Sequence, residues 1–234
     1  MRLLLLSNSR NPGQGYLEHV RREIPDFLGS IREIVFVPYA GVQVSHAEYT
    51  TNVRKAFAEL GISVTAVTEV ADPVGLVRQA KAIAVGGGNS FQLLRLMYEE
   101  GLLSVVREGV RTGLPYIGWS AGSNLACPTI RTTNDMPIVE PPSLTALALV
   151  PFQINPHYTD KVIPNHGGES RDDRLTEFLT LNPELKVIGL REGSWLRRED
   201  SSLHLGGPLP LKLFQHGKEP LELEPGNLSL LDAV

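Results

Sequence analysis

The clearest pattern in the chain is a series of short apolar runs separated by segments of helical periodicity. Five such runs occur in the first half of the chain, at residues 3–6, 34–37, 62–67, 82–85 and 115–118. Unbroken apolar runs of this length are typical of parallel strands that are covered on both faces. The pattern therefore predicts five buried strands.

The segments between these runs place apolar residues at helical spacing. Val53, Phe57 and Leu60 recur three to four residues apart after Ser45, which can cap a helix together with Glu48. Further helices are expected around residues 91–97, 105–110 and 170–179. Strands and helices that alternate in this way predict an α/β fold with a mostly parallel sheet.

The second half of the chain is less regular. Residues 128–156 are rich in Thr, Asn, Asp and Pro, which disfavours regular structure and predicts a long functional loop. Residues 187–190 form one more apolar run, and we expect a late strand there. After residue 195, short apolar pieces interrupted by glycines predict β-hairpins.

Composition and charge narrow the class of protein. The 234 residues are 42% hydrophobic and carry a formal net charge of −4, which suits a soluble globular protein forming a single domain over residues 1–234. No run of Lys or Arg stands out, so we expect neither nucleic acid nor a membrane as a partner. Cys127 is the only cysteine, so no intrachain disulfide can form, and residues 3–6 are too short for a signal-peptide core. We therefore expect a cytoplasmic location.

Ser120 is the first candidate for chemistry. It lies in a G-x-S-x-G pattern, between Gly118 and Gly122, directly after the fifth apolar run. In this context the serine occupies a sharp strand-to-helix turn that exposes its hydroxyl for attack on a carbonyl. The alternative for Ser120 is a helix N-cap without a catalytic role.

A serine nucleophile needs a general base. The six histidines of the chain are His19, His46, His157, His166, His204 and His216. Of these, His157 follows an apolar stretch and a conformationally fixed proline, so it is the preferred candidate. An imidazole used as a base is usually oriented by a carboxylate. Asp135 in the long loop and Glu192 after the late strand are both candidates for that acid, and the residues alone leave the choice open.

The glycine triplet at residues 86–88 follows the fourth apolar run. Its backbone N–H groups, with Gly88 foremost, could form half of an oxyanion hole, and the N–H of Ala121 could form the other half. The triplet lacks the spacing of nucleotide-binding loops.

No metal is expected, because no metal-binding spacing of His, Cys, Asp and Glu occurs. No organic cofactor is expected either. Arg171 follows the expected helix cap Ser170 and could bind a substrate anion, or could be an ordinary surface cation.

Several segments resemble the cytoplasmic α-aspartyl dipeptidases of serine peptidase family S51. The similar segments are residues 3–8, 38–41, 85–94, 116–122, 124–137, 153–157 and 187–193. They span most of the chain, and the poorly matching parts, residues 143–150 and the tail after about residue 203, hold no motif.

The resemblance implies an activity and a set of roles. The fold is expected to be a three-layer sandwich like the class I glutamine amidotransferases (flavodoxin-like), and the reaction to be hydrolysis of dipeptides with an N-terminal aspartate. Ser120 and His157 match the nucleophile and the base, while Asp135 and Glu192 both match positions proposed for the acid. Asn89 and Arg171 are the expected substrate-binding residues.

Other functions remain open from the sequence. A cyanophycinase-like isoaspartyl peptidase or a small serine esterase would share the serine pattern, and a non-catalytic binding module could use the glycine triplet alone. We expect a small peptide as the partner and a monomer or a homodimer as the assembly.

Overall fold

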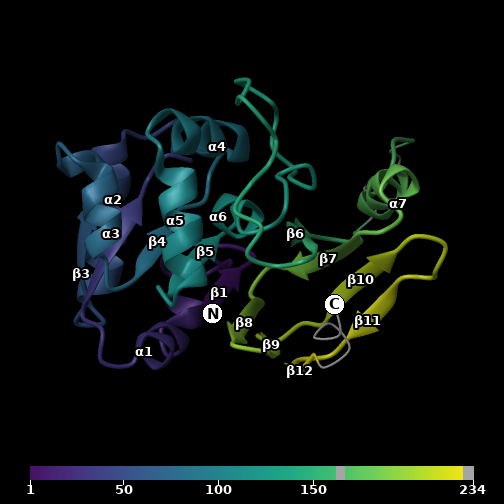
Figure 1. Cartoon of the computed structure of the whole chain (residues 1–234). Coiled ribbons are helices and arrows are strands. Elements are labelled where there is room, and N and C mark those ends of the chain that lie inside the picture. Colours follow the sequence, from purple (N-terminus) through teal and green to yellow (C-terminus); the bar gives the residue numbers. More distant parts are fainter. Residues whose placement is uncertain (162–166, 229–234) are drawn as a thin grey trace.

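The structure is a computed structural model that describes residues 1–161 and 167–228 (Figure 1). In these residues the larger of two sheets has eight strands, in the order β12-β9-β8-β1-β5-β4-β2-β3. The parallel part consists of β1 (Arg2–Leu6), β5 (Tyr116–Trp119), β4 (Ile83–Val85), β2 (Glu33–Val37) and β3 (Ser63–Ala66). The antiparallel part consists of β8 (Trp195–Glu199), β9 (Ser202–Gly206) and β12 (Gly226–Asn227).

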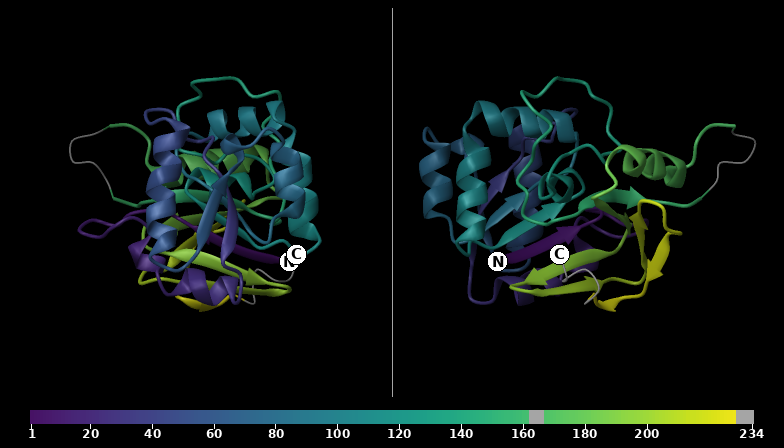
Figure 2. Two further views of the ribbon diagram at one scale, coloured as in Figure 1. Left: turned by 90° about the vertical axis from the view of Figure 1, so that its left-hand side faces the viewer. Right: turned by 45° about the vertical axis from the view of Figure 1, so that its right-hand side comes forward.

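Helices cover both faces of the larger sheet (Figures 1 and 2). On one face lie α1 (Glu23–Leu28), α2 (His46–Ala58) and the 3₁₀ turn η1 (Glu18–Val20). On the other lie α3 (Pro73–Gln79), α4 (Ser90–Glu99), α5 (Leu102–Arg111) and α6 (Ala121–Leu125), with a second 3₁₀ turn, η2 (Val67–Glu69), after β3. The described part of the chain therefore forms the expected three-layer α/β arrangement.

The alternation of side chains along β1 shows why the apolar runs are unbroken. Leu3 and Leu5 pack into the core beneath α3–α6, whereas Leu4 and Leu6 pack into the core beneath α1 and α2. Successive side chains of a strand point to opposite faces, so a strand between two helical layers must be apolar at every position.

A smaller sheet lies beside the larger one and carries part of the site. Its order is β11-β10-β7-β6, made of β11 (Leu221–Leu223), β10 (Leu211–Gln215), β7 (Lys186–Arg191) and β6 (Gln153–Tyr158). Helix α7 (Arg171–Leu181) packs on it through Leu175 and Leu179, against Val187 and Phe214. Figure 2 shows this sheet and α7 as a projection from the main body.

Most of the predicted elements are confirmed, and the differences have physical reasons. The five early strands, the late strand and the hairpins after residue 195 are present. The predicted loop 128–156 is wrong at its end, because residues 153–156 belong to β6. This is an edge strand of the smaller sheet, where a proline such as Pro156 is tolerated. Helices α1 and α3 were not predicted, since each has only six or seven residues.

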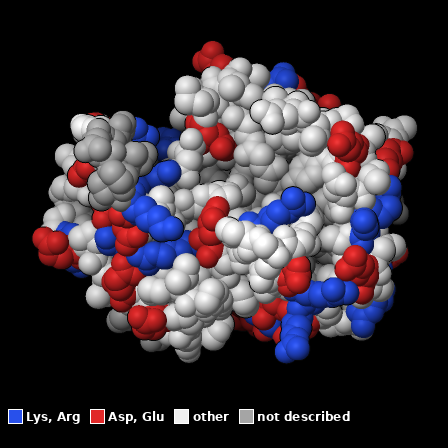
Figure 3. All heavy atoms as spheres, turned by 180° about the vertical axis from the view of Figure 1, so that it is seen from behind, with Lys and Arg blue, Asp and Glu red and all other residues white. Residues whose placement is uncertain are grey.

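Charged side chains of both signs are mixed on one face of the molecule (Figure 3). On the face shown in Figure 3, Lys and Arg side chains lie among Asp and Glu side chains rather than in one basic field. Over residues 1–161 and 167–228, each helix is too short or too polar to cross a bilayer.

Candidate active site

Ser120 lies between the end of β5 and the start of α6, in a backbone conformation that few residues adopt. Its φ is 54° and its ψ is −113°, and its N–H donates to the Leu6 carbonyl at the end of β1. A positive φ in a non-glycine residue stores strain and is typical of the turn that presents a nucleophile. The predicted strand-to-helix turn is therefore present.

The two glycines of the pattern are required by close packing of this turn. A Cβ at Gly118 would lie 2.6 Å from the carbonyl carbon of Gly122. A Cβ at Gly122 would overlap the carbonyl oxygen of Val85 on β4. The turn thus folds back against the neighbouring strand, and only glycine leaves room for it.

This packing gives a prediction for stability. We expect Gly122→Ala to lower the free energy of unfolding by about 1–3 kcal/mol, because the added methyl group forces backbone atoms apart. In a domain of this size that change lowers Tm by roughly 2–4 °C per kcal/mol. The measurement is thermal unfolding. Gly109→Ala is the matched control, since a Cβ there meets no backbone atom and only the Leu114 side chain, with Cδ2 at 3.2 Å and Cβ at 3.7 Å. Equal Tm values for Gly122→Ala and the wild type would contradict this packing argument.

His157 reaches Ser120 from the smaller sheet. Its Nε2 lies 2.9 Å from Ser120 Oγ, and its Nδ1 lies 2.6 Å from Glu192 Oε1. An ionised carboxylate only accepts hydrogen bonds, so Nδ1 carries the proton that it donates to Glu192. The unprotonated Nε2 is then free to accept the proton of the Ser120 hydroxyl.

The strand pairing explains why Glu192 is the carboxylate beside His157. Strands β6 and β7 are parallel neighbours, with Pro156 opposite Leu190 and a register shift between Pro156 and Tyr158. His157 sits in that irregularity with a φ of 52° and therefore projects toward the residue just beyond the end of β7. The side chains of His157 and Glu192 are 40% and 50% exposed, so solvent weakens the attraction between their charges.

Asp135 does not contact the imidazole. Its Oδ2 accepts hydrogen bonds from the backbone N–H of Ser90, at 2.7 Å, and from the Thr133 hydroxyl, at 2.9 Å. A carboxylate at the start of α4 is favoured by the helix dipole, which gives Asp135 a local reason to lie there. Of the two candidate acids, Glu192 is therefore the one that hydrogen-bonds to His157, and Asp135 is bound to the start of α4.

Two polar residues after β1, neither of which was predicted from the sequence, hold the base and the acid in place. The buried Ser7 hydroxyl accepts the N–H of His157 at 2.9 Å and donates to the Leu190 carbonyl at 2.7 Å. Asn8 accepts the N–H of Gly193, next to Glu192, at 2.8 Å. The only signal for them in the sequence is the position of two polar residues at the carboxyl end of a buried strand.

Backbone N–H groups border Ser120 on the side of the glycine triplet. Gly87 packs so closely that a Cβ there would lie 2.9 Å from Ser120 Cβ, and Gly88 has a φ of 136°. Ala121 is the first residue of α6, so its N–H has no partner within the helix. In the described residues neither the Gly88 nor the Ala121 N–H has a backbone acceptor outside regular elements, so both are available to an oxyanion.

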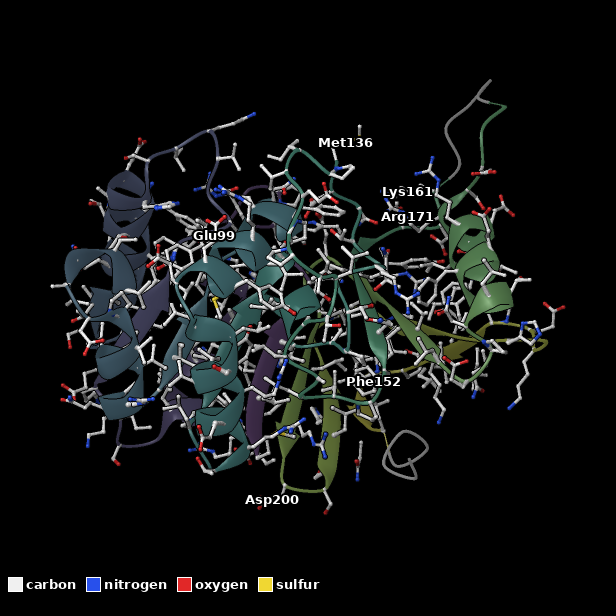
Figure 4. All side chains as sticks on the ribbon, turned by 45° about the horizontal axis from the view of Figure 1, so that its top comes forward. Glu99, Met136, Phe152, Lys161, Arg171 and Asp200 are labelled. Atoms are coloured by element: carbon white, nitrogen blue, oxygen red, sulfur yellow. The ribbon has the colours of Figure 1, made fainter. Side chains whose placement is uncertain are left out.

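A cavity of about 800 Å³ opens over these groups. Ser120, His157 and Asp135 line it, together with residues 87–89. Its rim carries four large, exposed apolar side chains, which are Val42, Val44, Met136 and Ile138. Figure 4 shows Met136 on the long loop that covers this side. The cavity thus combines a polar floor with an apolar entrance.

The two expected substrate-binding residues differ in their surroundings. Asn89 lines the cavity, but its Oδ1 caps α4 through the N–H groups of Phe91 and Gln92, and its Nδ2 donates to the Met136 carbonyl. Arg171 begins α7 (Figure 4), outside the residues that line the cavity. Partial burial, and then the nearby Arg174, lower the pKa of Arg171. Among the described residues it forms no ion pair, so its charge is available.

The other histidines lie elsewhere. His46 begins α2, His204 is on β9, and His216 follows β10. His19 is in the turn η1, where burial lowers the pKa of its imidazole. His166 lies outside the described residues.

A serine hydroxyl, an imidazole and a carboxylate joined by hydrogen bonds at the end of a parallel strand define the arrangement of a serine hydrolase. The model of the peptidase family S51 matches residues 3–206. The chain therefore belongs to that family, which confirms the resemblance seen in the sequence, and it is a peptidase of the serine type.

Named relatives cover nearly the whole chain. Peptidase E of Nostoc sp. strain PCC 7120 is 52% identical over 232 residues, which are 98% of this chain and 96% of that protein. Peptidase E of Salmonella typhimurium is 49% identical over 227 residues, or 97% and 99% of the two chains. A crystal structure of a putative peptidase E from Listeria monocytogenes superposes with a TM-score of 0.65 at 22% identity, over 88% of this chain and 98% of that one. This last likeness supports the fold alone.

Proposed function

We propose that the protein is a dipeptidase that hydrolyses dipeptides with an N-terminal aspartate through an acyl-enzyme on Ser120. The observation that carries the proposal is the series Ser120–His157–Glu192, with hydrogen-bond distances of 2.9 and 2.6 Å. Relatives at about half identity over nearly the full chain are named peptidase E, which supports the choice of a small peptide as substrate.

The reaction follows from the placement of these groups. Ser120 Oγ forms a bond to the carbonyl carbon of the aspartyl residue while its proton passes to His157 Nε2. The carbonyl oxygen becomes an oxyanion, which the N–H groups of Gly88 and Ala121 stabilise. The C–N bond then breaks, His157 gives its proton to the leaving amine, and a water molecule hydrolyses the resulting ester by the same route. Glu192 stabilises the imidazolium at each step.

Asp135 is suited to bind the free amino group of the substrate. It lines the same cavity as Ser120, and its Oδ2 is held by Ser90 and Thr133. A carboxylate held in this way can face an ammonium ion with its second oxygen. This role would restrict the enzyme to substrates with a free N-terminus.

Arg171 is the proposed partner of the substrate's aspartate side chain, and this gives a testable expectation. Arg171→Met should lower kcat/KM for aspartyl-leucine by roughly 10- to 100-fold, mainly through KM, because hydrogen bonds to charged groups contribute about 1.5–3 kcal/mol. The measurement is leucine release from aspartyl-leucine and from asparaginyl-leucine, and the preference for the former should collapse in the variant.

Arg174→Met is the matched control for Arg171. Arg174 lies on the same helix, is 67% exposed and faces Glu169 at 3.8 Å, so its loss should leave the preference for aspartate intact. An Arg171→Met enzyme that still prefers aspartyl-leucine as strongly as the wild type does would refute the role of Arg171, although Ser120 chemistry would stand.

The apolar cavity rim favours a second candidate, a small serine esterase. A p-nitrophenyl ester distinguishes the two functions, since an esterase should turn it over faster than any dipeptide. A binding module would show no turnover of either compound, and its ligand affinity would survive Ser120→Ala.

We also propose a cytoplasmic location. The free and buried Cys127 supports it, because disulfides are rare in reducing compartments.

A further inference from the structure

A tyrosine from α2 reaches the glycine triplet that follows β4. The Tyr49 hydroxyl lies 3.0 Å from the Gly87 carbonyl oxygen and 3.0 Å from Trp119 Nε1. Trp119 immediately precedes Ser120. The hydroxyl thus connects the strand that carries the nucleophile to the loop that supplies an oxyanion donor.

The direction of these hydrogen bonds is fixed by chemistry. An indole N–H can only donate, so Tyr49 accepts from Trp119 and must direct its own proton to the Gly87 carbonyl. Burial raises the pKa of Tyr49, so the hydroxyl keeps this proton. The Tyr16 hydroxyl, 3.4 Å away, lies on the accepting side of Tyr49. Tyr49 therefore donates a hydrogen bond to the loop at neutral pH.

The sequence of the loop makes room for this contact. A Cβ at Gly86 would lie 2.5 Å from the Tyr49 hydroxyl oxygen, so only glycine at position 86 admits the hydroxyl. Tyr49 itself is held by an edge-to-face contact with Phe36, with ring centroids 5.3 Å apart. Tyr49 as a whole is only 9% exposed. The donor is thus rigid, while the loop that it holds is built of glycines.

A trans peptide couples the carbonyl of one residue to the N–H of the next. In the Gly87–Gly88 peptide the two groups point in opposite directions, so fixing the Gly87 oxygen also fixes the Gly88 N–H. Glycines resist rotation of such a peptide less than any other residue. A rotated peptide would present a carbonyl oxygen to the oxyanion and repel it.

We propose that Tyr49 is a positioning residue of the oxyanion hole, which acts by holding the Gly87–Gly88 peptide with the Gly88 N–H toward the reacting carbonyl. The inference rests on the proposed acyl-enzyme mechanism. It extends that mechanism to a residue outside the Ser120–His157–Glu192 triad. Tyr49 touches no reacting atom. Its contribution is confined to the transition state, where negative charge develops on the carbonyl oxygen.

Tyr49→Phe tests this role, since it removes the hydroxyl and keeps the ring. We expect kcat for aspartyl-leucine to fall by roughly 10- to 100-fold with KM nearly unchanged. This loss is smaller than that caused by removing an oxyanion donor, because the Gly88 N–H is still present but less well oriented. The affinity for an aspartyl aldehyde or boronate, which forms a tetrahedral adduct on Ser120, should fall by the same factor. Affinity for the product aspartate should stay constant, a pattern that a merely structural role would not produce.

Tyr16→Phe is the matched control, because it removes a hydroxyl from the same cluster but leaves the Tyr49–Gly87 bond in place. It should keep kcat within about twofold. Equal losses of kcat in the two variants, or a Tyr49→Phe enzyme with wild-type kcat and wild-type adduct affinity, would overturn the proposal.

A further measurement separates this inference from the proposed substrate. The rate at which a small fluorophosphonate labels Ser120 also depends on the oxyanion hole, but it needs no dipeptide. If the wild type is labelled yet does not hydrolyse aspartyl-leucine, the substrate assignment fails and the labelling rate of Tyr49→Phe still tests Tyr49. A labelling rate unchanged by Tyr49→Phe would refute the role of Tyr49 alone.

Discussion

Replacement of Ser120 by alanine is expected to lower kcat for aspartyl-leucine by about 10⁵- to 10⁶-fold, the scale at which a lost nucleophile acts in serine proteases. No other hydroxyl in the described residues stands 2.9 Å from the His157 Nε2 atom, so no group replaces the lost nucleophile. Steady-state hydrolysis by the purified variant measures the effect.

The control for this variant is Ser9→Ala. Ser9 lines the same cavity but makes no hydrogen bond to His157 in the described residues, so its loss should change kcat by less than about tenfold. Both variants should unfold at the wild-type Tm, because alanine fits the backbone of serine. A Ser120→Ala enzyme with a tenth or more of the wild-type activity would mean that another residue carries the chemistry.

Replacement of Glu192 by glutamine should lower kcat by about 10²- to 10⁴-fold. The upper bound is the effect of neutralising the buried acid of a serine protease. The effect should be smaller here, since Glu192 is 50% exposed and water can partly stabilise the imidazolium. Neutral glutamine removes that stabilisation and no longer fixes the proton on Nδ1. The loss should appear in kcat for aspartyl dipeptides and for p-nitrophenyl esters alike.

Asp135→Asn provides the contrast to Glu192→Gln. If Asp135 binds the substrate's amino group, its neutralisation should raise KM for dipeptides by roughly tenfold and leave the turnover of esters without an amino group unchanged. Small and equal effects in the two variants would contradict both assignments, and a larger loss of kcat in Asp135→Asn would exchange them.

The parts of the fold that the sequence predicts well are those in which burial dictates residue type. Strand β1 is apolar at Leu3 to Leu6 because both faces of the sheet are covered, and this pattern is visible without a structure. Strand β6 gives no such signal, since it lies at a sheet edge and contains Asn155 and Pro156. A strand of this kind is defined by its neighbour, which only the three-dimensional arrangement provides.

In the candidate site, too, locally determined features are predictable from the sequence and features that depend on distant segments are not. Ser120 is predictable because a local turn, with glycines on both sides, determines its geometry. The acid is not predictable, because Asp135 and Glu192 both follow motifs of the right composition and only the pairing of β6 with β7 places one of them beside His157. Tyr49 lies 38 residues from Gly87 along the chain, and no local pattern joins them.

The central claim is that this site hydrolyses dipeptides at an N-terminal aspartate, and one panel of substrates tests it most directly. The panel compares kcat/KM of the wild type for aspartyl-leucine, asparaginyl-leucine, alanyl-leucine, N-acetyl-aspartyl-leucine and the β-linked isomer of aspartyl-leucine, with Ser120→Ala as the blank. We expect aspartyl-leucine to be preferred by about 10- to 150-fold over each of the others, because loss of a charged contact costs about 1.5–3 kcal/mol and the scissile bond is the α-linked one. Faster cleavage of the β-linked isomer, or equal cleavage of alanyl-leucine, would contradict the central claim.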